Sequence, residues 1–327
     1  MLESRRSSLT SIPLSHANLT AAIEHGVGYL AKAQQPSGAF ETLTSPKPDF
    51  SGATPYRKSV YVTTYVMHTL AGLPPSSQIE TIQQKAAAFL QAEQEEDGAW
   101  NYEGRGEWRI PADLDDTSCA IAALTQLKYQ PELSFYALLW QNESAAGGPY
   151  YTWIGINDRP DDPRAGQIDA LVNANILYCS GLLNLSLPGT ISYLEQVILA
   201  EAYHSQSLFL TAPHFLIYAL SRAYADGEVS KLETAISIMQ DYVLTKLPPP
   251  HVETSVFRQA CLATSLLNMK VPSILIRPYL MPLLTSQMVE GCWPAEPAYA
   301  GFSPSFDGSA ALTTAIAIEA LAKYALV

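Results

Sequence analysis

A spacing of the form Leu-x3-Gln-x3-Gly-x-aromatic occurs three times in this chain of 327 residues. Its copies begin at Leu30, Leu90 and Leu283, and they end on Phe40, Trp100 and Trp293. In each copy the glycine allows the left-handed turn that ends a helix, and the glutamine can bond backbone groups at that turn. The aromatic ring then covers the seam beside the turn. A chain that repeats such a fastening is expected to be built of repeated helical units.

The whole chain divides into six helical pairs, each with a break between an outer helix and a more apolar inner helix. The breaks lie near Gly38, Gly98, Gly147, Ser205, Pro248 and Gly291. The inner helices are expected over residues 59–72, 113–127, 168–183, 209–224, 253–269 and 308–325. Few segments show the alternation of a half-buried strand. The sequence therefore predicts an all-α fold, a single (α/α)6 barrel over residues 18–327, preceded by a flexible tail over residues 1–17.

The amino-acid composition limits the kinds of binding partner and cellular compartment that are expected for this chain. Apolar residues make up 48% of the chain and charged residues 15%, below the roughly one quarter that is usual for soluble domains. The net charge of −12 argues against a nucleic-acid partner, which needs basic residues to neutralise phosphates. The apolar runs are too short for a transmembrane segment. Four cysteines without CxxC spacing suggest free thiols in a reducing compartment. We expect a cytoplasmic monomer or weak oligomer, either free or peripheral to a membrane.

A cluster of three aspartates precedes the second inner helix, in Ile-Pro-Ala-Asp113-Leu-Asp115-Asp116-Thr-Ser. Helix capping explains Asp113 as the N-cap and Asp116 as its partner three residues later. Capping gives Asp115 no specific role. Three carboxyl groups at the start of a buried helix are costly unless the protein uses them.

The chemical interpretation of this cluster is a Brønsted acid. Protonation of an isolated alkene needs an acid that keeps its proton near neutral pH. Burial and neighbouring carboxylates raise the pKa of a carboxyl group, and donors to its conjugate base allow the proton to leave. Asp113 and Asp116 share one helix face because they lie three residues apart, whereas Asp115 points elsewhere. Asp115 is therefore expected to face the cavity.

The two patterns together resemble those of a known enzyme superfamily. The three spacings resemble the QW repeats of squalene–hopene and oxidosqualene cyclases, which share the α/α barrel of protein prenyltransferase β subunits. DLDDTS resembles the DxDD(T/S)A motif of class II terpene cyclases, whose middle aspartate is the proton donor. The resemblance implies that Asp115 is the donor, supported by Asp113 and Asp116. It covers residues from about 20 to 327, although repeats three to five lack the QW pattern.

A single barrel is unusual in this superfamily, where the active site commonly lies between two. The chain is similar to the small single-barrel class II cyclases of cyanobacteria, which close prenylated hydroxybenzoates into polycyclic meroterpenoids. This resemblance implies an isoprenoid or a prenylated aromatic acid as substrate and no required cofactor, with Mg²⁺ needed only for a substrate that carries a diphosphate. The cavity is then expected in the mouth of the barrel, under the loops 41–58, 102–112, 148–167 and 294–307.

The other candidate site residues lie in the first turns of the inner helices and in these loops, where they are expected to converge around Asp115. Aromatic faces stabilise carbocations, and guanidinium groups bind acidic head groups, although core packing explains any single aromatic equally well. Candidates to support the acid or the final deprotonation are Asn173, Asn175 and His214. Candidates to bind substrate are Arg57, Tyr61, Tyr65, Trp108, Trp153, Phe215, Tyr218, Phe257, Arg258, Phe302 and Phe306.

Several other functions remain open on the sequence. A class I-like cyclase would use a metal to ionise a diphosphate, and the acidic loop 157–162 offers oxygen ligands. A zinc prenyltransferase needs a converging Asp, Cys and His, and Cys292 has no suitable histidine nearby. A glycosidase could pair Asp115 with Asp169. A non-catalytic isoprenoid-binding barrel would leave the aspartate cluster unexplained.

Overall fold

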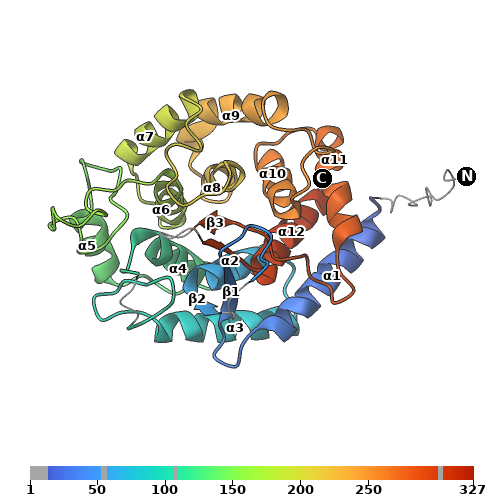
Figure 1. The fold of residues 1–327 in the computed structure, drawn as a ribbon, viewed down its shortest axis with the longest axis horizontal. Coiled ribbons are helices and arrows are strands. Elements are labelled where there is room, and N and C mark those ends of the chain that lie inside the picture. The colour runs from blue at the N-terminus through green and yellow to red at the C-terminus, as the bar shows by residue number, and fades with distance from the viewer. Residues whose placement is uncertain (1–13, 53–56, 107–109, 301–304) are drawn as a thin grey trace, which may run out of the picture.

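The computed structural model describes residues 14–52, 57–106, 110–300 and 305–327. Within these ranges the protein is mostly helical, and its α-helices form two concentric layers (Figure 1). The inner helices are α2 (Val60–Ala71), α4 (Leu114–Gln126), α6 (Ala170–Leu182), α8 (His214–Ala225), α10 (Val256–Asn268) and α12 (Ala310–Ala325). The outer helices are α1 (His16–Ala33), α3 (Ser77–Ala92), α5 (Leu133–Gln141), α7 (Pro188–Leu199), α9 (Glu233–Thr245) and α11 (Ser273–Ser286).

The inner helices form a closed ring. Each one packs against the next along the chain, and α12 packs against α2. Their bounds agree with the expected ranges to within two or three residues, except that α8 begins at His214 rather than near residue 209. Pro213 occupies the N-cap position of α8, and the backbone before it bridges to another segment at Tyr299. No helix in the described ranges combines the length and the apolar character that crossing a membrane requires.

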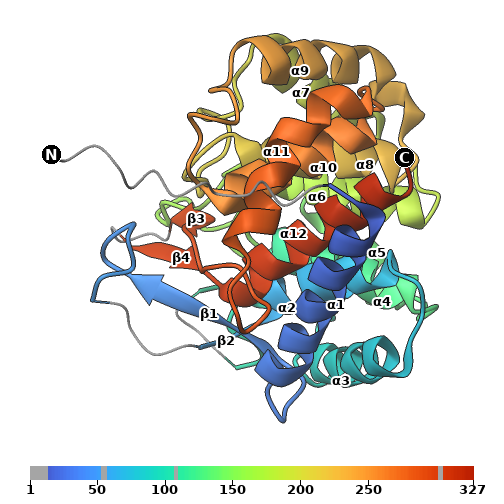
Figure 2. The ribbon, with the colours of Figure 1, turned by 90° about the vertical axis from the view of Figure 1, so that its right-hand side faces the viewer.

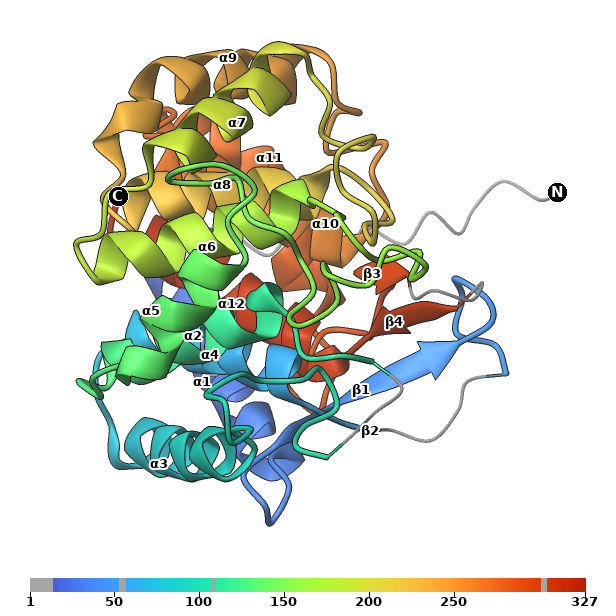
Figure 3. The same cartoon turned by 90° about the vertical axis from the view of Figure 1, so that its left-hand side faces the viewer.

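A small antiparallel sheet, which the sequence did not predict, lies at one end of this ring (Figures 2 and 3). Its strands are β1 (Phe40–Ser45), β2 (Arg57–Ser59), β3 (Tyr299–Ala300) and β4 (Phe306–Gly308), in the order β2-β1-β4-β3. Because β2 leads into α2 and β4 leads into α12, the sheet covers the N-terminal end of the inner helices. It joins the first repeat to the last. The strands are short, and β1 pairs with β4 far away in the sequence, so no alternation of polar and apolar residues predicts them.

Each repeated glutamine bonds the backbone of its own turn, as expected, and two of the three also connect neighbouring outer helices. The side-chain amide of Gln34 donates to the carbonyl of Gly38 at 3.0 Å and to that of Ile82 on α3 at 2.9 Å. Gln287 does the same with Gly291 and with Ala22 on α1, both at 2.9 Å. Gln287 therefore links the last outer helix to the first and helps to close the outer layer.

The two repeated tryptophans connect the outer helices α3 and α11 to the inner layer. The indole Nε1 of Trp293 donates to the carbonyl of Leu283 at 2.8 Å, and its backbone N donates to Thr314 Oγ1 at 3.1 Å. Trp100 makes the equivalent bonds to Leu90 and Thr117 at 2.7 and 3.0 Å. These residues are confirmed as structural fastenings, and they hold the helix ends around the site described next.

Candidate active site

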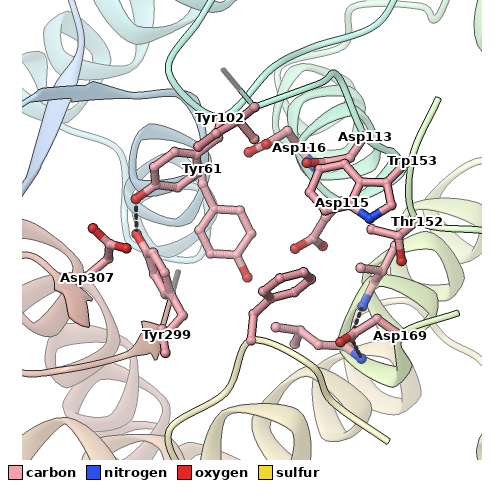
Figure 4. A pocket seen from close by; sticks show the side chains of 15 residues that line it. Tyr61, Tyr102, Asp113, Asp115, Asp116, Thr152, Trp153, Asp169, Tyr299 and Asp307 are labelled. Atoms are coloured by element: carbon pink, nitrogen blue, oxygen red, sulfur yellow. Dashed lines mark hydrogen bonds between the residues drawn. The ribbon is translucent and has the colours of Figure 1, made fainter. Parts of the chain in front are cut away.

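A cavity of about 120 Å³ opens at the N-terminal end of the inner helices, beneath the sheet. Aromatic and aliphatic side chains make up much of its wall (Figure 4). The aromatic residues are Tyr61, Tyr102, Trp153, Phe209 and Tyr299, and the aliphatic side chains include Ile110, Leu171 and Val172. The carboxyl groups on this wall belong to Asp113, Asp115, Asp116, Asp169 and Asp307. The cavity therefore combines an apolar surface with a cluster of acids.

The start of α4 places the aspartate cluster at this cavity. Asp113 is the N-cap, and its Oδ1 accepts a hydrogen bond from the backbone N of Asp116 at 2.7 Å. The backbone here is also held from both sides, because Asp113 N donates to the carbonyl of Trp100 and Leu114 N donates to that of Thr152. Capping thus accounts for Asp113, as expected, and fixes the direction in which the next turn of the helix faces.

Asp115 directs its carboxyl group into the middle of the cavity (Figure 4). Its Oδ1 accepts a hydrogen bond of 2.7 Å from the side-chain amide of Asn175 on α6. The residue is only half-buried in total because it borders the hollow, although protein surrounds the carboxyl group on its other sides. Burial, followed by the neighbouring Asp113, raises the pKa of Asp115 well above its ordinary value. These surroundings favour the protonated form of this carboxyl group.

Asp116 also belongs to the cavity wall but is only 2% exposed. Burial and the charges of Asp113 and Asp115 raise its pKa strongly, and burial also raises the pKa of Asp113. Within the described residues, Asp116 Oδ1 has no hydrogen-bond partner. Neighbouring carboxyl groups disfavour ionisation of one another, so the closeness of these three groups favours protonation within the cluster.

The two asparagines of α6 have different surroundings. Asn173 is a structural residue, because its side chain bonds the backbone N and carbonyl of Tyr150 at 2.8 and 3.0 Å. Asn175 instead contacts the acid: its Nδ2 donates to Asp115, while its Oδ1 accepts from Arg222 on α8 at 2.6 Å. Of the two amides, only Asn175 is placed to support Asp115.

His214 and the candidate arginines lie outside the cavity wall. His214 is 4% exposed, and burial lowers its pKa to about 4. Neither of its ring nitrogens has a hydrogen-bond partner in the described part of the chain. Arg57 forms an ion pair with Glu103 near the sheet, and Arg258 lies 3.7 Å from Glu253. These three residues are near the mouth of the ring, not beside Asp115.

The candidate aromatics divide into a cavity wall and the core behind it. Tyr61 lines the cavity and packs on Tyr65 with a centroid distance of 4.9 Å. Phe215 packs behind them and contacts Tyr218 and Phe257, with centroid distances of 5.8 and 5.3 Å.

The remaining aromatic candidates are more dispersed. Trp153 lines the cavity directly. Phe306 lies on β4, paired with Ser45 and Ala300 in the sheet. Trp108 and Phe302 fall outside the described residues.

Several residues of this region, among them Phe209, were not foreseen. Tyr102 and Tyr299 meet across the cavity with their hydroxyl oxygens 2.6 Å apart, and Asp307 lies close by. They come from a loop and from the sheet, 197 residues apart in the case of the tyrosine pair, so no local pattern predicts their meeting. The sequence does contain a feature that could have identified Arg222, because it is a charged residue inside an apolar inner helix, four residues after Tyr218.

The possible metal-ligand sets lie elsewhere. In the acidic loop 157–162, Asp162 is bound by the guanidinium of Arg164 at 2.9 and 2.7 Å. Cys292 contacts Met288. Among the described residues, the group of His, Asp and Glu side chains close enough to share an ion is at the opposite end of the ring, and it consists of His68, Asp226 and Glu319. The Lys323 ammonium already lies 2.7 and 2.8 Å from the two oxygens of Asp226.

Asp169 gives the site a measurable pH dependence of stability. Although three backbone N–H groups bond its carboxylate, burial raises its pKa to about 6. A carboxyl group whose folded pKa exceeds its unfolded value of 3.8 stabilises the fold below that value, and this contribution is lost as pH rises through 6. We therefore expect the unfolding free energy of wild type to fall between pH 4 and 7 by about 3 kcal/mol more than that of Asp169→Asn, which has no carboxyl group at this position. Urea unfolding at several pH values measures this, and parallel stability curves would contradict it.

Comparison with solved structures places this geometry in a known fold. The structure of the type II terpene cyclase MstE from Scytonema superposes with a TM-score of 0.73 over 95% of this chain and 99% of that chain, at 18% identity. A structure of the same cyclase in complex with geranylgeranyl dihydroxybenzoate gives a TM-score of 0.71 at 19% identity, over 95% and 98% of the two chains. This is the fold of a type II terpene cyclase. No protein-family model and no curated protein sequence matches the chain.

The fold is shared more widely. ent-Copalyl diphosphate synthase from Streptomyces platensis superposes with a TM-score of 0.60 at 14% identity, over 81% of this chain and 50% of that chain. An unsaturated glucuronyl hydrolase specific for heparin gives a TM-score of 0.59 at 12% identity, over 95% and 98% of the chains. Because a cyclase and a hydrolase share the architecture, the function of this chain must be argued from its cavity.

Proposed function

We propose that this protein is a class II terpene cyclase that starts its reaction by proton transfer from Asp115 to an alkene. The supporting observation is the position of this carboxyl group: it borders an aromatic-walled cavity, its pKa is raised by burial, and one of its oxygens accepts a single amide hydrogen bond. We further propose that the closed ring of helices is one (α/α)6 barrel domain, which begins at α1 and supplies the whole site.

The reaction follows from the contacts of Asp115. Transfer of its proton to the terminal alkene forms a carbon–hydrogen bond and leaves a tertiary carbocation. Asn175 donates to the carboxylate that remains, which lowers the cost of proton release. Internal alkenes then attack the cation in turn, while the faces of Tyr61, Phe209 and Trp153 stabilise positive charge and exclude water. Loss of a proton from the final cation completes a net isomerisation.

The substrate class is proposed from the cavity and from the fold. MstE binds geranylgeranyl dihydroxybenzoate and yields merosterolic acid A, so we propose a linear isoprenoid or a prenylated aromatic acid for this chain. We propose that the cavity space of about 120 Å³ receives the terminal isoprene unit beside Asp115. The rest of the chain then extends towards the mouth, where Arg57 offers a guanidinium for an acidic head group. A divalent cation is needed only if that head group is a diphosphate.

The glycosidase alternative is weaker because of how Asp169 is held. Its Oδ1 accepts from the backbone N of Leu171 and Val172, and its Oδ2 accepts from that of Leu208 at 2.5 Å. Both oxygens therefore serve in helix capping and in loop attachment. A glycosidase needs a second carboxyl group that is available to water or sugar, and Asp169 has both oxygens engaged by backbone N–H groups.

Turnover in D₂O tests the proposed function. Geranylgeranyl dihydroxybenzoate is incubated with the protein and EDTA, and the product is analysed by mass spectrometry and NMR. We expect a cyclic isomer that carries one deuterium on the carbon of the former terminal alkene, because Asp115 exchanges with solvent before it delivers its proton. A farnesyl diphosphate arm, with and without Mg²⁺, tests the metal-dependent alternative. Cyclisation that requires Mg²⁺ and introduces no deuterium would overturn the proposal, as would recovery of unchanged substrate from every arm.

A further inference from the structure

Arg222 is a buried cation without an anionic partner. It lies in the middle of the protein at 2% exposure, and no carboxylate of the described residues forms an ion pair with it. Its guanidinium carbon instead lies 4.6, 4.4 and 5.5 Å from the ring centroids of Tyr65, Tyr178 and Tyr218. Cation–π contacts offset only part of the cost of burying a charge. Such a residue is expected to have a function that compensates for this cost.

The nearby carboxylates are engaged elsewhere and do not neutralise Arg222. Glu319 accepts a hydrogen bond of 2.7 Å from Tyr218 and lies 3.4 Å from the ammonium of Lys323. Lys323 also binds Asp226. The tyrosine rings therefore stabilise the charge of Arg222 without neutralising it, and this charge acts to lower the pKa of Asp115.

The hydrogen bonds of Arg222 decide how the amide of Asn175 is oriented. A guanidinium can only donate, so the atom of Asn175 that lies 2.6 Å from Arg222 Nη2 must be the oxygen. The hydroxyl of Tyr65 donates to the same oxygen at 3.3 Å. The NH₂ group of Asn175 consequently faces Asp115, with a distance of 2.7 Å to Oδ1.

This orientation in turn decides which oxygen of Asp115 carries the proton. An oxygen that accepts a hydrogen bond from an amide NH₂ cannot point a proton of its own at the same donor. Oδ1 is thus the carbonyl oxygen of the neutral acid, and the proton belongs on Oδ2. Within the described part of the chain Oδ2 has no hydrogen-bond partner, and the carboxyl group faces the hollow (Figure 4). The proton is therefore presented to the cavity.

We propose that Arg222 is a positioning residue that acts through Asn175 to hold the acidic proton of Asp115 on the oxygen facing the substrate. This inference rests on the proposed cyclase function. Arg222 locks the amide in the donating orientation, and its charge stabilises the carboxylate left after proton transfer. Without Arg222 the amide can rotate, so that its oxygen accepts the proton of Asp115 and holds it away from the alkene.

The test compares Arg222→Gln and Arg222→Lys with wild type in kcat, KM and the pH profile of kcat. Besides Arg222 on α8, the titratable groups around Asp115 lie in α2, α4 and α6 or at the N-caps of the last two of these helices. They are Tyr61, Tyr65, Asp113, Asp116, Cys119 and Asp169. Activity requires protonated Asp115, so it falls as pH rises through the pKa of this group. Removal of a nearby positive charge raises that pKa.

For Arg222→Gln we expect kcat to fall about 10- to 100-fold with little change in KM, by analogy with the loss of supporting hydrogen bonds around other reactive groups. The basic limb of the profile should move up by about one pH unit. Arg222→Lys keeps the charge, so its limb should stay near that of wild type while kcat falls less. Arg277→Gln, the same change on the exposed side of α11, is the control. The inference is overturned if the basic limb of the pH profile of kcat moves equally in both Arg222 variants, or in neither of them.

A measurement without substrate separates this inference from the proposed function. The infrared difference spectrum between wild type and Asp115→Asn isolates the carbonyl stretch of the protonated carboxyl group of Asp115, and its titration gives the pKa directly. If Asp115 is ionised at neutral pH in wild type, the proposed cyclase function fails. If it is protonated but the stretch and the titration are unchanged in Arg222→Gln, only the role of Arg222 fails. If Arg222→Gln does not fold, the same titration in Arg222→Lys and Asn175→Leu decides: an unchanged band in Asn175→Leu overturns the inference.

Discussion

Asp115→Asn is expected to abolish cyclisation while the fold stays intact. The amide keeps the shape of the neutral acid, and its oxygen can still accept the hydrogen bond from Asn175. It has no proton that an alkene can remove. A positioned general acid contributes a factor of about 10² to 10⁴ to the rate, and Asp113 is already engaged in capping α4. We therefore expect turnover to fall at least about 10³-fold, measured as cyclic product per unit time under single-turnover conditions.

The fold of this variant should be unaffected, because the substitution replaces one neutral group by another. Circular dichroism and the urea midpoint provide that check. Asp241→Asn is the matched control, since it makes the same chemical change on the exposed face of α9 and should leave turnover unchanged. Product formation by Asp115→Asn at a rate near that of wild type would remove the basis of the acid assignment. A loss equal to that in Asp241→Asn would do the same.

The sequence predicts those parts of the site in which the role of a residue depends on its chemical type and on its spacing from residues nearby in the chain. Asp113 and Asp116 have the spacing of a capping pair, so the odd placement of Asp115 between them marks it as a residue that capping does not explain. The fastenings at Gln34, Trp100 and Trp293 could be recognised in the same way, because each depends on residues close in the chain and on a repeated interval. Regular spacing was sufficient to place the inner helices around the acid.

The contacts that support the acid depend on tertiary packing and could not be read from spacing. Asn173 and Asn175 are equivalent in the sequence, two amides two residues apart in an apolar helix. Rotation of α6 in the ring turns one towards Tyr150 and the other towards Asp115. His214 is similar, since its place near the start of an inner helix suggested the cavity, whereas the late start of α8 leaves it outside the cavity wall.

Trp293→Ala is expected to cause the largest loss of stability. The indole is fully buried, its N–H bonds α11, and its backbone N bonds α12. Its ring also lies against Gly26 of α1, so the side chain joins the last repeat to the first. Truncation of a buried tryptophan costs about 3 to 5 kcal/mol, a large part of the roughly 5 to 15 kcal/mol that stabilises a typical protein. Chemical unfolding followed by circular dichroism measures this loss.

Two further variants separate burial from hydrogen bonding at this position. Trp140→Ala removes the same side chain from α5, where it is 77% exposed, and should change the unfolding free energy by no more than about 0.5 kcal/mol. Trp293→Phe keeps an aromatic ring but leaves the carbonyl of Leu283 without its donor, which costs roughly 1 to 3 kcal/mol. The expected order of loss is therefore Trp293→Ala, then Trp293→Phe, then Trp140→Ala. Equal losses at positions 293 and 140 would show that neither the burial of Trp293 between the first and last repeats nor its hydrogen bond to the carbonyl of Leu283 holds the ring of helices closed.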